Sequence, residues 1–276
     1  MMNIGFLTGL EALRLLKRNP VKYLRGVGGM YLLSVKGYEL GQIARASFFF
    51  FRNLDDALDG DRKDIKNPLS HILACREQIS SGQYSGKPQI VNLAKFAIER
   101  LQKKSKKGDN PKQNFLDEID IMLFDYHRAR KREMLTLKQL KSYYQHTFFP
   151  VVNLTLIGLG SKLRAGDIAE LSLCQGRVYT IRDLDQDWAR GVINIPKEVL
   201  RQAQLTPNAS VQKVRSSQTV KKWFRNEVLE CQKDLEILRE KLVAANESLT
   251  ARFCLGLASP LFKLSKQYLS TYFIKF

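Results

Sequence analysis

Apolar residues recur every three to four positions along most of the chain, which is the spacing of one face of an α-helix. The pattern is clearest at Trp223, Cys231, Leu235, Leu238 and Leu242. We predict helices over residues 3–18, 35–59, 67–79, 88–105, 113–132, 137–160, 166–190, 214–246 and 250–273. Turn-forming residues separate them at Gly26–Gly29, Ser81–Pro88, Gly108–Pro111 and Leu205–Ser210. Because the alternation typical of strands is scarce, the predicted fold class is all-α.

The length predicts a single domain. A chain of 276 residues can form one large core, so we expect residues 1–276 to fold together. Residues 1–25 are predicted to form an N-terminal helical extension, and the lysine-rich tract 103–111 a solvated loop. No apolar run reaches the roughly 18 residues needed to cross a bilayer. The first residues are apolar and then basic, which is the reverse of a signal peptide, so we expect a cytoplasmic protein.

The net charge of the chain indicates which class of partner it binds. The chain has 45 lysine and arginine residues against 27 aspartate and glutamate residues, a formal net charge of +18. This excess favours an anionic partner such as nucleic acid, a membrane surface or a diphosphate. No RNA-binding signature or zinc-finger spacing is present, so no nucleic-acid partner is predicted. Residues 259–276 mix aromatic side chains with lysines, which suits either the last core helix or a peripheral contact with a membrane.

A first acidic motif follows four consecutive phenylalanines. Asp55 and Asp59 are four residues apart and share one face of a helix, and Asp56 flanks that face. Like charges at this spacing cost an isolated helix about 0.2–0.5 kcal/mol, and more where the helix is buried. A cation relieves this repulsion, and carboxylate oxygens are the ligands that Mg²⁺ prefers. We therefore predict that these three aspartates bind magnesium.

A second acidic motif repeats this spacing. Asp183 and Asp187 are again four residues apart, on a helix predicted to end near Gly191, whereas Asp185 is expected to point elsewhere. Arg182 and Arg190 lie close to the pair in sequence. Two such motifs facing each other across a helical bundle would hold several Mg²⁺ ions around one diphosphate. Metal and arginine would neutralise that leaving group, and an apolar cavity would shield a carbocation from water.

The two motifs together resemble those of the squalene/phytoene synthase family. The residues that match its second motif, R-D-x-x-x-D-x-x-R-G followed by L-P, are Arg182, Asp183, Asp187, Arg190, Gly191 and Ile195–Pro196. Those that match its first motif, R-x-x-D-[DE]-x-x-D, are Arg52, Asp55, Asp56 and Asp59. A looser likeness extends over residues 28–270. The resemblance implies an isoprenoid synthase helical bundle around a central apolar cavity, with the two Asp-rich motifs facing each other.

The activity that the resemblance implies is that of a magnesium-dependent prenyltransferase. Such an enzyme ionises farnesyl (C15) or geranylgeranyl (C20) diphosphate and couples two of them to a long isoprenoid, with release of diphosphate. Two or three Mg²⁺ ions would be held by the aspartates of both motifs, and Arg52, Arg182 and Arg190 would bind the substrate diphosphate. A reductant such as NADPH is compatible with this activity but is not indicated by the sequence, and a monomer and a homodimer are both open.

Three positions depart from the family pattern. Where many members have S-x-S-F, this chain has Gly26–Gly29. Backbone N–H groups of a glycine-rich loop also hold phosphate, so Gly28 is predicted to contact the diphosphate. Gly176 and Tyr179 replace a glutamine and an asparagine; both are expected to line the cavity, where the Tyr179 ring would stabilise a cation.

These departures leave other activities open. One alternative is a class I terpene synthase that cyclises a single prenyl diphosphate in the same fold. Another is a catalytically silent family member that acts as an assembly or binding factor.

Overall fold

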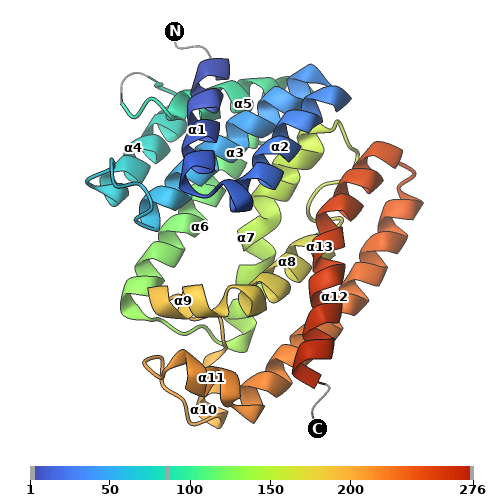
Figure 1. Ribbon diagram of the computed structural model, residues 1–276. Coiled ribbons are helices and arrows are strands. Elements are labelled where there is room, and N and C mark those ends of the chain that lie inside the picture. The colour runs from blue at the N-terminus through green and yellow to red at the C-terminus, as the bar shows by residue number, and fades with distance from the viewer. Residues whose placement is uncertain (1–3, 85–86, 274–276) are drawn as a thin grey trace. The chain divides into compact units, whose positions relative to one another are not determined.

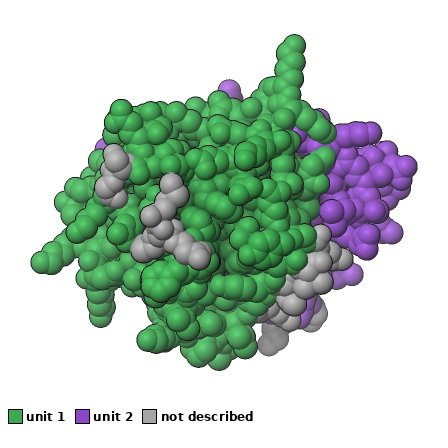
Figure 2. Space-filling view, turned by 90° about the horizontal axis from the view of Figure 1, so that it is seen from above, with its two compact units in different colours: residues 1–122, 153–160 green, residues 123–152, 161–276 purple. Residues whose placement is uncertain are grey.

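The computed structural model describes residues 4–84 and 87–273. Within these residues it contains thirteen α-helices and no β-strand, which confirms the all-α class (Figure 1). The chain forms two compact units, coloured separately in Figure 2. Unit 1 comprises Met1–Met122 and Asn153–Gly160, and unit 2 comprises Leu123–Val152 and Ser161–Phe276. The single domain over residues 1–276 stays a prediction, and residues 1–3, 85–86 and 274–276 lie outside the described residues.

Unit 1 is built around one buried helix, α3. Its helices are α1 (Ile4–Arg18), α2 (Pro20–Lys36), α3 (Tyr38–Leu58), α4 (Pro68–Ser81), α5 (Val91–Lys104), the first part of α6 (Pro111–Lys131) and the last part of α7 (Leu137–Gly158). Helices α1, α2, α4 and α5 all pack against α3. Phe49, Phe50 and Leu54 of α3 are buried, and the Phe51 ring lies 4.8 Å from that of Phe115. Three of the four phenylalanines before the first acidic motif, Phe49, Phe50 and Phe51, thus belong to the core.

The ends of α4 follow directly from the local sequence. The Asn67 side chain accepts a hydrogen bond of 3.1 Å from the Ser70 N–H, and Pro68 occupies the first helical position. Gly82 ends the helix with a φ of 74°, which glycine adopts at little cost. Residues 105–110 then connect α5 to α6, inside the tract predicted to be a loop.

The predicted break at Gly26–Gly29 is wrong. These residues lie inside α2, whose amides are engaged in helical hydrogen bonds rather than exposed as in a phosphate-binding loop. Close packing of α2 on α3 accounts for this, since a Cβ atom on Gly41 of α3 would lie only 2.7 Å from the Ser34 backbone. Such tertiary contacts override the low helix propensity of glycine. Diphosphate binding by Gly28 stays a prediction, but without the loop on which it was based.

Unit 2 contains the remaining helices. They are the second part of α6, the first part of α7, α8 (Ala169–Arg182), α9 (Leu184–Arg190), α10 (Lys197–Gln202), α11 (Val211–Ser216), α12 (Gln218–Ala244) and α13 (Ser248–Phe273). Helix α8 is buried on all sides from Leu171 to Val178 and packs against α12 and α13. In the described part of the C-terminal stretch 259–276, Leu261 and Ser265 of α13 are buried. Of the two interpretations of the C-terminal stretch, the structure therefore favours a core helix.

Three further boundaries differ from the predictions. The predicted helix 166–190 is divided at Asp183 into α8 and α9, and the predicted helix 214–246 is divided at Ser217, whose hydroxyl caps α12. Helix α10 was not predicted, because six residues are too few for a periodic pattern. None of the helices described here combines the length and apolar character needed to cross a membrane.

Candidate metal and diphosphate site

The first acidic motif lies at the C-terminal end of α3 in unit 1. Asp59 directly follows the helix, and its N–H donates a hydrogen bond of 2.9 Å to the Asp55 carbonyl oxygen. The two carboxylates therefore lie one turn apart, and both are half-buried. Arg52 forms an ion pair of 2.8 Å with Asp55. This arrangement brings together one predicted diphosphate ligand and one predicted metal ligand.

Asp56 differs from its neighbours because it is buried and paired with two arginines. It forms ion pairs with Arg52 and, at 2.8 Å, with Arg18 of α1. The Tyr23 hydroxyl of α2 accepts hydrogen bonds from the same two arginines. A buried carboxylate with both oxygens engaged in this way anchors α1 and α2 to α3. The contacts favour a structural role for Asp56, and its role as a metal ligand stays a prediction.

The second acidic motif lies where α8 passes into α9 in unit 2. Asp183 has a non-helical φ of −97°. Its N–H nevertheless donates to the Tyr179 carbonyl at 2.8 Å, and the Asp183 carbonyl accepts from the Asp187 N–H at 2.9 Å. The i, i+4 relation thus continues through the bend, and Asp183 and Asp187 are both half-buried. Asp185 is exposed and pairs with Arg215 at 2.6 Å. Its expected orientation away from the pair is confirmed.

Arg182 links Asp183 to Tyr179. Its guanidinium donates two hydrogen bonds to the Asp183 carboxylate, at 2.7 and 2.6 Å. The same group lies 3.9 Å from the centre of the Tyr179 ring, which makes an edge contact with Phe148 at 5.7 Å. Arg182 is exposed, as is Arg190 at the end of α9. Three of the predicted residues, Tyr179, Arg182 and Asp183, therefore lie in direct contact.

Asp187 has an excess of negative charge around it. Burial, and then the charge of Asp183, raise the pKa of Asp187 to about 7, while a hydrogen bond from Asn194 lowers it. The charge of Asp125 on α6 raises this pKa further and that of Arg128 lowers it. Bringing a cation to Asp187 would remove the repulsion that raises its pKa.

A chain of buried polar contacts supports Asp187. The Asn194 amide donates to Asp187 Oδ2 at 3.0 Å, and its oxygen accepts from Arg128. Arg128 is fully buried; it also donates to Asp125 at 2.7 Å and to the Ile193 carbonyl at 3.3 Å. Tyr143 of α7 donates to Asp125 at 2.7 Å, and its ring lies 4.6 Å from the Arg128 guanidinium. The orientation of Asp187 is thus coupled to α6 and α7.

Gly191 brings Asn194 to this position. It ends α9 with a φ of 91°, and a Cβ atom there would lie 2.3 Å from the Ala129 carbonyl oxygen of α6. Only glycine combines this backbone conformation with so close an approach. The chain that follows pairs Ile193 with Met134 in an isolated bridge beside the end of α6. The glycine of the motif therefore places the residues after it against Arg128.

Gly176 has a packing role in the structure. A Cβ atom on Gly176 would lie 2.6 Å from Cβ, Cγ and Cδ1 of Tyr144, a buried residue of α7. The predicted exposure of position 176 to a cavity is therefore wrong: the glycine allows α8 to approach α7. No side chain fits there without movement of a helix, because the atoms it would meet are at the rigid base of an aromatic ring.

The carboxylate pairs fit magnesium better than a metal held by protein alone. Among the described residues, no group of three or more His, Cys, Asp or Glu side chains forms a ready-made metal site. Magnesium usually takes only one or two carboxylates and completes its shell with water and phosphate. A half-buried pair such as Asp183 and Asp187, with a raised pKa at Asp187, meets that requirement.

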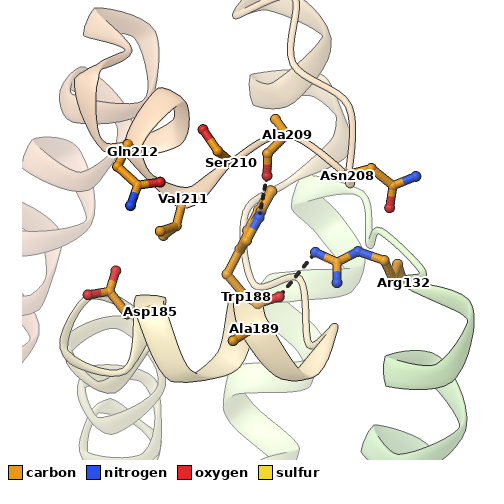
Figure 3. A pocket seen from close by; sticks show the side chains of 9 residues that line it. All are labelled: Arg132, Asp185, Trp188, Ala189, Asn208, Ala209, Ser210, Val211 and Gln212. Atoms are coloured by element: carbon orange, nitrogen blue, oxygen red, sulfur yellow. Dashed lines mark hydrogen bonds between the residues drawn. The ribbon is translucent and has the colours of Figure 1, made fainter.

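A separate pocket lies on the Asp185 side of α9 (Figure 3). It has a volume of about 360 Å³ and is lined by Arg132, Asp185, Trp188, Ala189 and residues 208–212. The Trp188 ring N–H donates to the Ala209 carbonyl at 2.8 Å, and Arg132 donates to the Trp188 carbonyl at 3.0 Å. These polar groups hold the segment before α11 against α9, so we assign the pocket no binding role.

Two residues at the site were not predicted from the sequence. Arg18 contacts Asp56 from another helix, and no pattern in the sequence indicates this. Asn194 could have been recognised as the one polar residue in the otherwise apolar run from Val192 to Pro196.

The fold and the two carboxylate pairs define an all-α protein of the isoprenoid synthase class. A family model for squalene/phytoene synthase matches residues 45–259, so the chain belongs to that family. The match includes both acidic motifs and most of each unit. At the level of the family, these proteins are prenyl-transferring isoprenoid synthases. No curated protein matches the chain significantly.

Proposed function

We propose that this protein ionises C15 or C20 prenyl diphosphates with the help of Mg²⁺ and couples two of them to a long isoprenoid, releasing diphosphate. The observation that supports this most directly is the half-buried pair of Asp183 and Asp187, in which burial and then the charge of Asp183 raise the pKa of Asp187 to about 7. A carboxylate kept in such an environment is costly to the fold unless it binds a cation.

In this proposal Asp55, Asp59, Asp183 and Asp187 hold two or three Mg²⁺ ions. The bound ions supply the positive charge that stabilises the departing diphosphate. Arg52, Arg182 and Arg190 bind the diphosphate oxygens, since guanidinium groups match phosphate geometry. Arg52 and Arg182 now pair with Asp55 and Asp183, so each would exchange its carboxylate for a phosphate.

Tyr179 has a role that follows from its contact with Arg182. The guanidinium lies over the ring in the structure. When Arg182 turns to the diphosphate, the ring face is released and can stabilise the carbocation that ionisation leaves behind. Asn194 and Arg128 hold Asp187 in the orientation that its metal requires.

A class I terpene synthase acting on one diphosphate remains the second candidate, and the position of Tyr179 beside the motif favours it. Gly176 no longer supports it, because that residue packs against Tyr144. The raised pKa of Asp187 counts against a catalytically silent binding factor, since such a protein gains nothing from an unfavourable carboxylate. A cytoplasmic location and the absence of a nucleic-acid partner also stay predictions, and we see no contact that would favour NADPH.

The test is to incubate the purified protein and Mg²⁺ with farnesyl and geranylgeranyl diphosphate separately, and to measure released diphosphate and hydrocarbon products. A product with a doubled chain supports coupling, and a cyclic product with a single chain supports the second candidate. If no diphosphate is released from either substrate, both enzymatic proposals are wrong.

Variants of the second motif make this test specific. Asp183→Asn is expected to lower diphosphate release by roughly 100-fold or more, as does the loss of other charge-stabilising groups, and Asp55→Asn should act likewise. The matched control is Asp185→Asn, because Asp185 lies two residues after Asp183 but is exposed and pairs with Arg215. It should retain activity.

A further inference from the structure

The outer face of α1 is apolar. Phe6, Leu10 and Leu13 are 57%, 45% and 57% exposed. Their spacing of four and three residues places them in one stripe along the helix. The opposite side of α1 is also apolar, since Leu7, Ala12 and Leu15 are buried. A helix that is apolar on both sides is normally buried on both, so the exposed stripe of α1 is unusual for a protein surface.

Helix α2 continues this surface. Val21 and Leu24 are 90% and 65% exposed, and Tyr31, two helical turns after Leu24, is also exposed. Gly28 lies on the same side of the helix, with open space where a Cβ atom would be. Because α1 and α2 pack against each other in unit 1 (Figure 1), their stripes belong to one surface. We call Phe6, Leu10, Leu13, Val21, Leu24 and Tyr31 the N-terminal apolar face.

Exposed apolar side chains are concentrated in this part of the protein. Of the fifteen large hydrophobic residues that are exposed in the described chain, six belong to the N-terminal apolar face. Single exposed apolar residues are normal, but a cluster of them marks a contact surface.

The sequence of the segment that carries this face is basic. Residues 4–36 contain six lysines and arginines and one acidic residue, Glu11. Glu11 is turned inward, where it pairs with Arg14 at 2.7 Å and with Arg62 at 3.4 Å. Lys17 is exposed one turn after Leu13 on the same stripe. Arg14 and Arg18 pair with the carboxylates of Asp64 and Asp61, at 3.6 and 3.1 Å. Among the described side chains of α1, Lys17 therefore supplies the positive charge of this surface.

The combination of exposed apolar and basic side chains favours one kind of partner over the others. Amphipathic helices that lie in a membrane interface have large apolar residues on one face and lysine or arginine beside them. Each basic residue close to an anionic lipid surface adds to the attraction. A second copy of this chain fits less well, since it would bring together two chains that each carry a formal net charge of +18. Nucleic acid also fits less well, because its charged backbone does not complement exposed leucines.

We propose that the N-terminal apolar face binds the surface of an anionic lipid membrane, with α1 and α2 lying in the interface. This places the membrane contact on unit 1 rather than on α13, where Leu249 is the one exposed large apolar residue among those described. The proposal does not depend on the proposed reaction: the binding can be measured without substrate.

The test is sedimentation of the full-length protein with vesicles of phosphatidylcholine and phosphatidylglycerol, and with vesicles of phosphatidylcholine alone. We expect binding to the mixed vesicles and weaker binding to the neutral ones. The variant Phe6→Gln/Leu10→Gln/Leu13→Gln should bind the mixed vesicles at least ~10-fold more weakly, because three large apolar side chains are lost. Glutamine keeps the helix propensity of these positions high.

The matched control is Leu229→Gln/Ile237→Gln/Val243→Gln, which removes three exposed apolar residues from α12 and should bind as the unaltered protein does. Melting curves verify that both variants are folded. The proposal is wrong if the unaltered protein does not bind mixed vesicles, or if the two triple variants bind equally. It is also wrong if light scattering shows a dimer that only the α1 variant dissociates, with no vesicle binding.

Discussion

At the scale of single residues, the second motif depends on side chains outside it. Asp187 is held by Asn194, which is held in turn by the buried guanidinium of Arg128. Outer contacts of this kind set the orientation and basicity of a metal ligand. In the first motif, Arg18 and Arg52 hold the buried carboxylate of Asp56. The half-buried carboxylates of this motif are those of Asp55 and Asp59.

Replacing Asn194 tests this coupling. In Asn194→Leu the hydrogen bond to Asp187 is lost, and we expect the Mg²⁺ concentration that gives half-maximal activity to rise roughly 10-fold or more. The affinity for Mn²⁺ without substrate, measured by electron paramagnetic resonance, should fall in parallel.

The control for this variant is Asn208→Leu, in an exposed position of unit 2, which should leave both quantities unchanged. Asn194→Leu also leaves a donor of Arg128 unpaired, at a cost of about 1–3 kcal/mol in stability. If stability falls while the metal affinities stay the same, Asn194 has only a structural role.

At the scale of elements, the geometry of the second motif is set by how closely α8 approaches α7 and by where α9 ends. Gly176 permits the first, against Tyr144, and Gly191 the second, against Ala129. At both positions a side chain would collide with the neighbouring helix. The helices that approach each other so closely carry Asp183 and Asp187 or support them.

Gly176→Ala should therefore destabilise the protein by about 1–3 kcal/mol, the usual cost of overpacking, as measured by urea unfolding. Gly256→Ala is the comparison, because Gly256 also lies within a helix but has open space around it. That change should be neutral or stabilise by up to about 1 kcal/mol through helix propensity. Equal effects of the two substitutions would contradict the close packing of α8 on α7.

At the scale of the whole molecule, the proposed function requires both acidic motifs to hold one diphosphate. The first motif belongs to unit 1 and the second to unit 2, so the requirement can be tested through binding. Mg²⁺ with inorganic diphosphate should raise the melting temperature by roughly 5 °C at saturation.

Asp55→Asn and Asp183→Asn should each abolish this rise, and Asp185→Asn should keep it, as measured by differential scanning fluorimetry. A full rise in Asp55→Asn would mean that the second motif binds diphosphate without the first. Magnesium alone, without diphosphate, serves as the baseline for each variant.

Much of the protein could be predicted from local sequence because helices impose fixed spacings. Residues four apart share a face in any helix, so the pairs Asp55/Asp59 and Asp183/Asp187 and the outward direction of Asp185 were predicted correctly as geometry. Asn67, Pro68 and Gly82 likewise mark the ends of α4 through interactions within a few residues. The spacing of the apolar residues in α1 also indicates that both sides of this helix are apolar.

Only the tertiary structure decided which of these features meet. Three glycines, Gly26, Gly28 and Gly29, predicted a break, but packing on α3 keeps α2 helical. The contact between Arg128 and Asn194 joins residues 66 positions apart, and Gly176 is explained only by the Tyr144 ring beside it. No spacing rule relates such residues, since their distance depends on how whole helices pack. The sequence by itself therefore determined the helices and their acidic pairs, and packing determined what holds those pairs in place and which apolar face of α1 stays uncovered.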